Sequence, residues 1–131
     1  MDDTSNRPRV LVADDDQEVR STLTALLENE GYEVIEAING REAVALIAAR
    51  RPDLIILDLY MPIMNGWEVL DQLEAERIAD DVPVLVFAAT AQPETSFGNV
   101  FMLRKGADAG VLLATVAEEL SRHAQRSHSV S

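Results

Sequence analysis

The chain has 131 residues, of which 47% are hydrophobic, with no cysteine and a formal net charge of −12. A chain of this length forms one domain that buries roughly two-thirds of its unfolded surface, and the lack of cysteine excludes disulfides, thiolate nucleophiles and cysteine-based zinc sites. The negative charge repels DNA phosphates and anionic lipid, and no apolar run has the length of a membrane span or the form of a signal peptide. We therefore expect a cytoplasmic protein that binds neither nucleic acid nor membrane.

Short apolar segments alternate with longer amphipathic segments along the chain. Runs rich in Val, Ile and Leu predict five strands, at residues 9–13, 33–37, 54–57, 82–88 and 109–113. Apolar residues three to four positions apart predict helices after the first three strands, around residues 19–27, 43–48 and 67–73. Gly31 is typical of a residue that ends the first helix, and Asn39-Gly40 introduces the second.

The segment after the fourth predicted strand is the least regular. Residues 89–98 have the composition of a loop, and we expect helix over residues 97–105. The last predicted helix begins at Thr115, which forms a capping box with Glu118, and it ends in a basic stretch. One domain is expected over residues 8–126, with flexible termini at residues 1–7 and 127–131.

This alternation predicts an α/β fold of the flavodoxin-like type. We expect a doubly wound, five-stranded parallel sheet in the order 2-1-3-4-5, with helices on both faces. The unbroken apolar run at residues 54–57 fits a strand that is buried on both faces. In such folds the ligand site lies outside the carboxyl ends of the strands, where the strand order reverses. That edge is where functional residues are expected.

Carboxylates follow two strands that this order makes neighbours. Asp14, Asp15 and Asp16 follow the first strand, and Asp58 follows the third. Two unit charges ~5 Å apart repel by roughly 3 kcal/mol at an effective dielectric near 20, so acids gathered there either have raised pKa values or bind a cation. Carboxylate oxygens suit Mg²⁺. The simpler alternative is that Asp15 or Asp16 only caps the following helix.

Three segments together resemble the receiver domain of two-component response regulators. They are VLVADDDQEVR at residues 10–20, NGREA at 39–43 and PDLIILDLYMPIMNGWEVL at 52–70, and the resemblance extends over about residues 8–124. It implies that Asp58 is a phosphoacceptor for a histidine kinase or a histidine phosphotransfer protein, and that the chain is not an enzyme. It also implies Mg²⁺ as a cofactor, held by Asp14, Asp15, Asp58 and the backbone carbonyl of Tyr60.

The second half of the sequence departs from the family pattern. The family has a Thr or Ser at the end of the fourth strand, where this chain has Ala88, so Thr90 is a candidate phosphate contact two residues further on. The family also has a Lys-Pro pair and an aromatic switch residue on the fifth strand. Aligning residues 106–108 with the family's Gly-Ala-Asp string puts Leu113 and Ala114 at the Lys-Pro positions and Gly110 at the aromatic position. Lys105 then lies at a helix end as a solvated cation.

These departures leave two functions open. The first is a receiver that binds Mg²⁺ and accepts a phosphoryl group at Asp58 but has an altered switch output. The second is a phosphorylation-independent adaptor that uses the receiver fold to bind another protein. An aspartyl phosphatase is a third class, which the short chain disfavours because such enzymes need a lid and a later Lys. The sequence does not identify the kinase or the downstream protein target.

Overall fold

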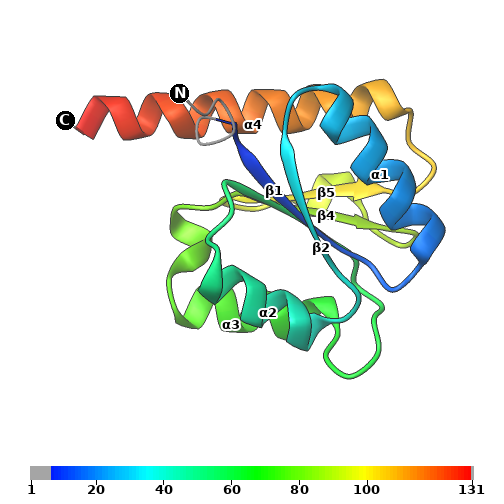
Figure 1. The fold of residues 1–131 in the computed structure, drawn as a ribbon. Helices are drawn as coiled ribbons and strands as arrows, with labels where there is room; N and C mark the ends of the chain where they lie inside the picture. Colours follow the sequence, from blue (N-terminus) through cyan, green and yellow to red (C-terminus); the bar gives the residue numbers. More distant parts are fainter. Residues whose placement is uncertain (1–6, 131) are drawn as a thin grey trace.

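The computed structural model describes residues 7–130, which form a parallel sheet between two layers of helices (Figure 1). The strands are β1 (Arg9–Ala13), β2 (Glu33–Ala37), β3 (Leu54–Leu57), β4 (Val84–Ala88) and β5 (Val100–Arg104). They pair in the order β2-β1-β3-β4-β5, with every pairing parallel. The predicted fold class and strand order are confirmed.

The helices are α1 (Gln17–Asn29), α2 (Gly40–Ala49), α3 (Gly66–Ala75) and α4 (Ala109–Val130), with short 3-10 turns η2 (Ile78–Asp80) and η3 (Pro93–Thr95). α1 and α4 cover one face of the sheet, and α2 and α3 cover the other (Figure 1). Asp16, Asn39 and Asn65 cap the first three helices by accepting hydrogen bonds from backbone N–H groups of the first turn. Of these described helices, none combines the length and apolar character needed to cross a membrane.

The expected flexible termini fall partly outside the described residues, which exclude 1–6 and 131. Near the carboxyl terminus, α4 continues to Val130, so the helix extends into residues 127–130, which were expected to belong to a flexible tail.

Two apolar layers hold the central strands in place. All four residues of β3 are buried, and so are residues 10–13 of β1. One layer packs against α1 and α4 through residues such as Leu27 and Val116, and the other packs against α2 and α3 through residues such as Ala43 and Leu73. Each fully buried Leu, Ile or Val contributes about 1.5–3 kcal/mol. The residues that follow β1 and β3 therefore start from a rigid base.

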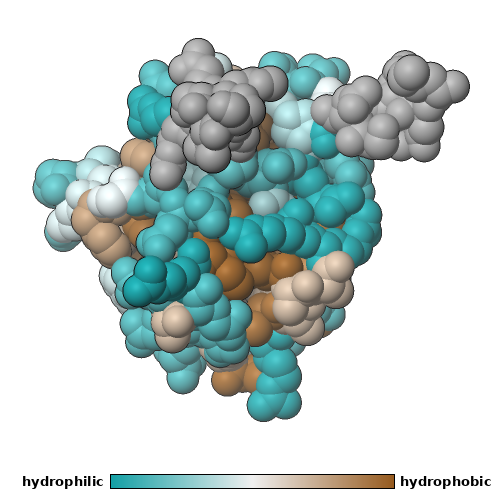
Figure 2. All heavy atoms as spheres, turned by 90° about the vertical axis from the view of Figure 1, so that its left-hand side faces the viewer, coloured by the Kyte–Doolittle hydropathy of each residue, from teal (hydrophilic) through white to brown (hydrophobic). Residues whose placement is uncertain are grey.

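The amino ends of the strands lie at the left of Figure 1, and Figure 2 views the molecule from that side. This surface is mainly hydrophilic around a central area of hydrophobic residues (Figure 2). The acid-bearing carboxyl ends of the strands lie at the opposite end of the sheet.

The last third of the chain differs from the prediction. Residues 100–104 form β5 where helix was expected, and residues 109–113 begin α4 where a strand was expected. Thr115 lies inside α4, where its hydroxyl donates to the carbonyl of Val111 at 2.8 Å, so it does not cap the helix. Asp108 does so instead, because its carboxylate accepts from the N–H of Gly110 at 2.6 Å. A run of five apolar residues fits either a buried strand or the start of an amphipathic helix.

β4 connects to β5 through residues 89–99, which contain only the turn η3. Parallel strands are usually joined by a helix. This connection instead folds against the outer edge of β5, where Phe97 and Val100 exchange backbone hydrogen bonds of 2.9 and 2.7 Å. The N–H of Met102, on the same edge, donates to the hydroxyl of Ser96 at 2.9 Å. The exposed edge of the sheet is thereby partly closed.

Candidate functional site

Three acids converge where β1 and β3 end. The two strands are paired from Val10↔Leu54 to Ala13↔Leu57, so the residues that follow them leave the sheet side by side. The N–H of Asp58 continues the ladder by donating to the carbonyl of Ala13 at 3.0 Å. One carboxylate oxygen from each of Asp14, Asp15 and Asp58 lies within 4.8 Å of the others. The acids that the sequence singled out therefore form one cluster.

Burial differs among these acids. Asp14 is 2% exposed and Asp58 is 5% exposed, whereas Asp15 is exposed. Burial raises the pKa of Asp58, and the negative charge of Asp14 raises it further, while Lys105 acts in the opposite direction. The charged form of the Asp58 carboxylate therefore depends on nearby cations such as Lys105.

Lys105 is the functional residue that the sequence analysis placed wrongly. It follows β5 directly, and its Nζ lies 2.7 Å from Oδ2 of Asp14 and 3.4 Å from Oδ2 of Asp58. It is not a solvated cation at a helix end, because residues 100–104 form a strand beside β4 and the carboxyl end of that strand meets the acid cluster. The backbone N–H of Lys105 extends the pairing of β4 with β5 by donating to the carbonyl of Ala88 at 3.0 Å.

The positions proposed for the Lys-Pro pair and the aromatic switch are wrong for the same reason. Gly110, Leu113 and Ala114 all lie in α4. Two local signals could have revealed the correct boundary. Gly106 follows the strand closely and has a φ of +97°, a backbone conformation that favours glycine. Asp108 is a typical N-cap residue for a helix that begins at residue 109.

The ammonium group of Lys105 is stabilised by the acids. Burial lowers its pKa, but the hydrogen bond with Asp14 and the negative charges of Asp14 and Asp58 outweigh burial, and the pKa is raised overall. Lys105 is therefore charged at neutral pH and offsets part of the negative charge of the cluster.

Ala88 and Thr90 occupy different environments beside the site. Ala88 ends β4, is fully buried and carries no hydroxyl. Thr90 is exposed, and its hydroxyl donates to the phenol oxygen of Tyr60 at 3.1 Å. The candidate phosphate contact is therefore bonded to the side chain two residues beyond Asp58.

The loop after Asp58, residues 59–65, is held at both ends by glycines. The N–H of Gly66 donates to the carbonyl of Leu59 at 2.9 Å, and the N–H of Gly40 donates to the carbonyl of Met64 at 3.0 Å. A Cβ atom at Gly66 would collide with the carbonyl oxygen of Asp58, and one at Gly40 would collide with that of Met64. Only glycine permits these close approaches, so the loop beside the acids is fixed by packing.

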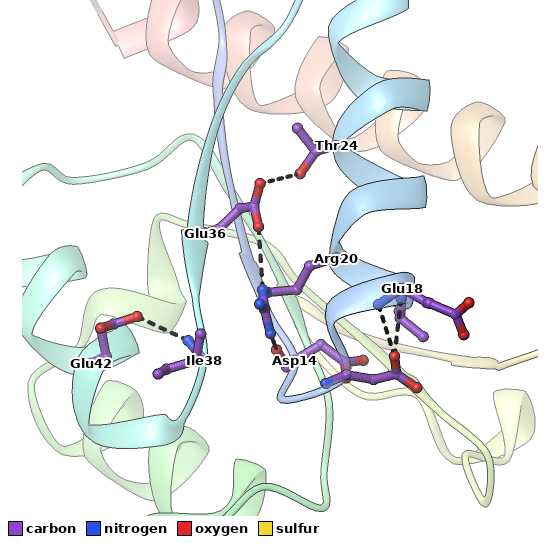
Figure 3. A network of polar contacts seen from close by, with 9 residues as sticks. Asp14, Glu18, Arg20, Thr24, Glu36, Ile38 and Glu42 are labelled. Carbon is purple, nitrogen blue, oxygen red and sulfur yellow. Dashed lines mark hydrogen bonds and ion pairs between the residues drawn. The ribbon is translucent and has the colours of Figure 1, made fainter.

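A second network orients the turn that carries Asp14 and Asp15 (Figure 3). Arg20 on α1 donates to the carbonyl of Asp14 at 2.8 Å and pairs with Glu36 on β2 at 3.2 Å. Thr24 donates to the other oxygen of Glu36 at 3.0 Å. These contacts tie α1, β2 and the end of β1 together and thereby position the acids.

A 2-1-3-4-5 parallel sheet with acids after β1 and β3 and a lysine after β5 defines the class as a receiver-type α/β domain. The chain belongs to the response regulator receiver domain family, whose model matches residues 10–120. Response regulator receiver domains act in two-component signalling.

Curated relatives support this membership. The chain is 38% identical over 120 residues to the transcriptional regulatory protein PrrA of Mycobacterium tuberculosis, a match that covers 92% of this chain and 49% of the relative. It is 48% identical over 81 residues to the response regulator MprA of Mycolicibacterium vanbaalenii, which covers 62% of this chain and 34% of the relative. The chain thus spans half or less of the length of these relatives.

Solved structures have the same fold. The receiver domain of the Francisella response regulator 1452 matches with a TM-score of 0.80 at 29% identity, covering 88% of this chain and 98% of that one. The response regulator TrrA of Thermotoga maritima, solved in complex with Mg²⁺ and BeF, matches with a TM-score of 0.75 at 28% identity, covering 86% and 98%.

Proposed function

We propose that the chain accepts a phosphoryl group on Asp58, in a magnesium-dependent transfer from a histidine kinase or a histidine phosphotransfer protein. The observation that carries this proposal is the cluster of Asp14, Asp15, Asp58 and Lys105 at the carboxyl ends of the strands. An acceptor carboxylate, oxygen ligands for a divalent ion and a fixed cation are the groups that phosphoryl transfer needs. The chain is used once per transfer and is not an enzyme in this proposal.

The donor set fits Mg²⁺, which prefers carboxylate and carbonyl oxygens. Both oxygens of Asp14 already have partners, because Oδ1 accepts from the N–H of Asp16 at 2.9 Å and Oδ2 pairs with Lys105. Asp15 and Asp58 would therefore hold the ion directly, Asp14 would act through water, and the carbonyl of Tyr60 would be a further ligand. When bound, the ion would offset negative charge on the carboxylates and the phosphoryl oxygens.

The residues of the chain have separate parts in the transfer. A carboxylate oxygen of Asp58 attacks the phosphorus of the donor phosphohistidine, an oxygen–phosphorus bond forms, and the nitrogen–phosphorus bond breaks to release the imidazole. Lys105 favours the charged form of Asp58 before attack and pairs with the added phosphoryl oxygens afterwards. Burial of Asp58 excludes water from the acceptor.

The donor is proposed to dock beside Asp58. A groove of about 470 Å³ between α1 and α4 reaches Lys105 and is lined by apolar side chains that include Val19, Leu23 and Phe87. A helix of the donor protein seated in this groove would present its phosphohistidine next to the acid cluster.

The switch output is proposed to be altered. Ala88 has no hydroxyl with which to bond a phosphoryl group on Asp58, and the hydroxyl of Thr90 is engaged by Tyr60. A ligand shifts a conformational equilibrium only through contacts that differ between the two states. Fewer such contacts on β4 imply a weaker response to phosphorylation.

A phosphorylation-independent adaptor is the second candidate. The observation in its favour is that Lys105 pairs with both Asp14 and Asp58, which compensates part of the acidic charge without any added ion. In that case the fold would bind its protein target in the unphosphorylated state.

The deciding experiment exposes the chain to acetyl phosphate, and separately to beryllofluoride, with and without Mg²⁺. Intact mass should show one Mg²⁺-dependent adduct that is absent from the Asp58→Asn variant. Amide NMR then tests the output: we expect shifts confined to the ends of β1 and β3, and wider shifts through β4 and β5 in an Ala88→Ser variant. No adduct on the wild-type chain would favour the adaptor, and shifts through β4 and β5 in the wild type would contradict an altered switch.

A further inference from the structure

The connection between β4 and β5 leaves a groove on the α3 side of the sheet. The groove has a volume of about 370 Å³ and is lined by Leu59, Tyr60, Trp67, Thr90, Ala91, Gln92, Thr95 and Met102. Its lining contains no charged side chain. Because residues 89–99 contain no α-helix, the groove lies where the crossover between two parallel strands would usually place one.

Large apolar side chains at this groove are exposed. Trp67 is 47% exposed and Tyr60 is 60% exposed, and both contribute to its wall. Exposed aromatic residues around a hollow are typical of sites where protein partners insert apolar side chains. The groove thus has the character of a binding surface for protein side chains.

Acidic residues flank the lining residues of the groove along α3 and η3, and we refer to these residues as its rim. Asp71 and Glu74 are exposed and lie one and two turns beyond Trp67 on the same side of α3, and Glu94 is exposed in η3. Arg104 is a basic residue beside the opposite wall, where its guanidinium donates to the carbonyl of Ala91 at 3.4 Å. The charge of the rim, within a chain of net charge −12, favours a basic partner.

We infer that this groove binds a basic amphipathic helix of a partner protein, with apolar residues in the groove and Lys or Arg against Asp71 and Glu74. A second copy of this chain fits poorly, because it would bring an equally acidic surface to the contact. An added strand also fits poorly, because Ser96 and Phe97 already occupy the edge of β5. The groove adjoins the acid cluster through Tyr60 and Thr90, but the inference does not depend on phosphorylation of Asp58.

Trp67 provides the measurement, because it is the only tryptophan of the chain. The probe is a synthetic helical peptide of about 15 residues with a Leu stripe at i, i+4 and i+7, Lys on the flanking positions, and no Trp or Tyr. Titration into the full chain at low salt should shift the Trp67 emission saturably. A peptide with the same stripe and Glu flanks, and a Lys peptide with its Leu residues changed to Ser, should each bind at least about ten-fold more weakly.

Two double variants with the same change of charge separate the rim from net charge. The Asp71→Lys/Glu74→Lys variant should lose at least about ten-fold in affinity, whereas Glu28→Lys/Glu30→Lys on the opposite face should lose less than about two-fold because distant charges are screened. All four positions are exposed, so both variants should fold, which circular dichroism checks. Equal binding of the Glu-flanked peptide, equal losses in the two variants, or no saturable shift would overturn the inference. An emission change that depends on protein concentration alone would assign the groove to a second copy instead.

Discussion

The half of the sheet that contains β1, β2 and β3 (the β1 side) is built differently from the half that contains β4 and β5 (the β5 side). β1, β2 and β3 are each followed by a capped helix of at least ten residues, whereas β4 passes to β5 through a loop with one 3-10 turn. Both sides nevertheless deliver a functional side chain to the same place, Asp14 and Asp58 from one side and Lys105 from the other. The position of a residue after a parallel strand is therefore set by the pairing of the sheet, while the connection between strands shapes the surface.

The largest expected effect tests whether the β5 side takes part in the chemistry. Replacing Lys105 by Ala removes a charged hydrogen-bond donor, which typically costs about 1.5–3 kcal/mol, so adduct formation at Asp58 with acetyl phosphate should slow by roughly ten- to hundred-fold. Lys105→Arg, which keeps the charge, should recover part of the rate. Arg104→Ala is the matched neighbour and should change the rate little. Equal rates for wild type and Lys105→Ala would mean that only the acidic side supports transfer.

The next effect isolates the β1 side. Mg²⁺ at ten times its Kd should stabilise the wild-type chain by about 1.4 kcal/mol, a rise of a few degrees in Tm. Asp15→Asn should abolish this rise. Asp16→Asn is the control, because Asn caps a helix as well as Asp does and the Mg²⁺-dependent rise should persist. Persistence of the rise in Asp15→Asn would remove Asp15 from the metal site.

A smaller effect concerns the charge of Asp58. Burial and the negative charge of Asp14 raise the pKa of Asp58 in the folded state. The folded state therefore binds the proton of Asp58 more tightly than the unfolded state does. The stability that this proton provides is complete below the ordinary carboxyl pKa and is lost as pH rises through the raised pKa. The Asp58→Asn variant has no carboxyl group at this position, so it should not lose stability in this way as pH rises. Without Mg²⁺ its Tm should exceed that of the wild type by a few degrees near pH 7, and the difference should shrink towards about pH 4.

Thermal melts across that pH range, with Asp71→Asn as an exposed control, provide the check. A lower Tm for Asp58→Asn at neutral pH would mean that attraction to Lys105 outweighs burial. The β5 side would then contribute more to stability than the acid cluster costs.

The smallest effect lies in the loop after Asp58. Ile63 has a φ of 72° and is 68% exposed, a conformation that is unfavourable for a β-branched residue. Ile63→Asn should raise the free energy of unfolding by about 1 kcal/mol, because Asn tolerates a positive φ. Ile38→Asn makes the same chemical change at an exposed residue without positive φ and should give no gain. Denaturant unfolding distinguishes the two, and a loss of stability at Ile63 would show that its side chain is needed there.

The sequence allowed most of the fold to be predicted, because strand and helix patterns agree with their caps in the first part of the chain. β1, β2 and β3 lie where expected, and Asn39 caps α2. The spacing of hydrophobic residues alone could not locate the fifth strand, since both residues 100–104 and residues 109–113 are short apolar runs. The expected helix over residues 97–105 then moved Lys105 away from the acids.

The acid cluster was predictable because its members follow strands whose order was predicted correctly. Lys105 was missed because its distance from Asp58 depends on where β5 ends. The predicted strand ended at residue 113 instead of residue 104, and nine residues of strand span about 30 Å. The hydrogen bond between Thr90 and Tyr60 joins side chains far apart in sequence, and no local pattern indicates it.

The two glycines that contact the loop after Asp58 have a consequence for ligand affinity. Ordering a backbone residue costs about 1–2 kcal/mol of entropy, and contacts at Gly40 and Gly66 make the chain meet this cost for residues 59–65 while it folds. An arriving ion or phosphoryl group then encounters a carbonyl and a carboxylate that are already immobile. Mild heat or low urea that loosens this loop should weaken ion affinity well before the sheet itself unfolds.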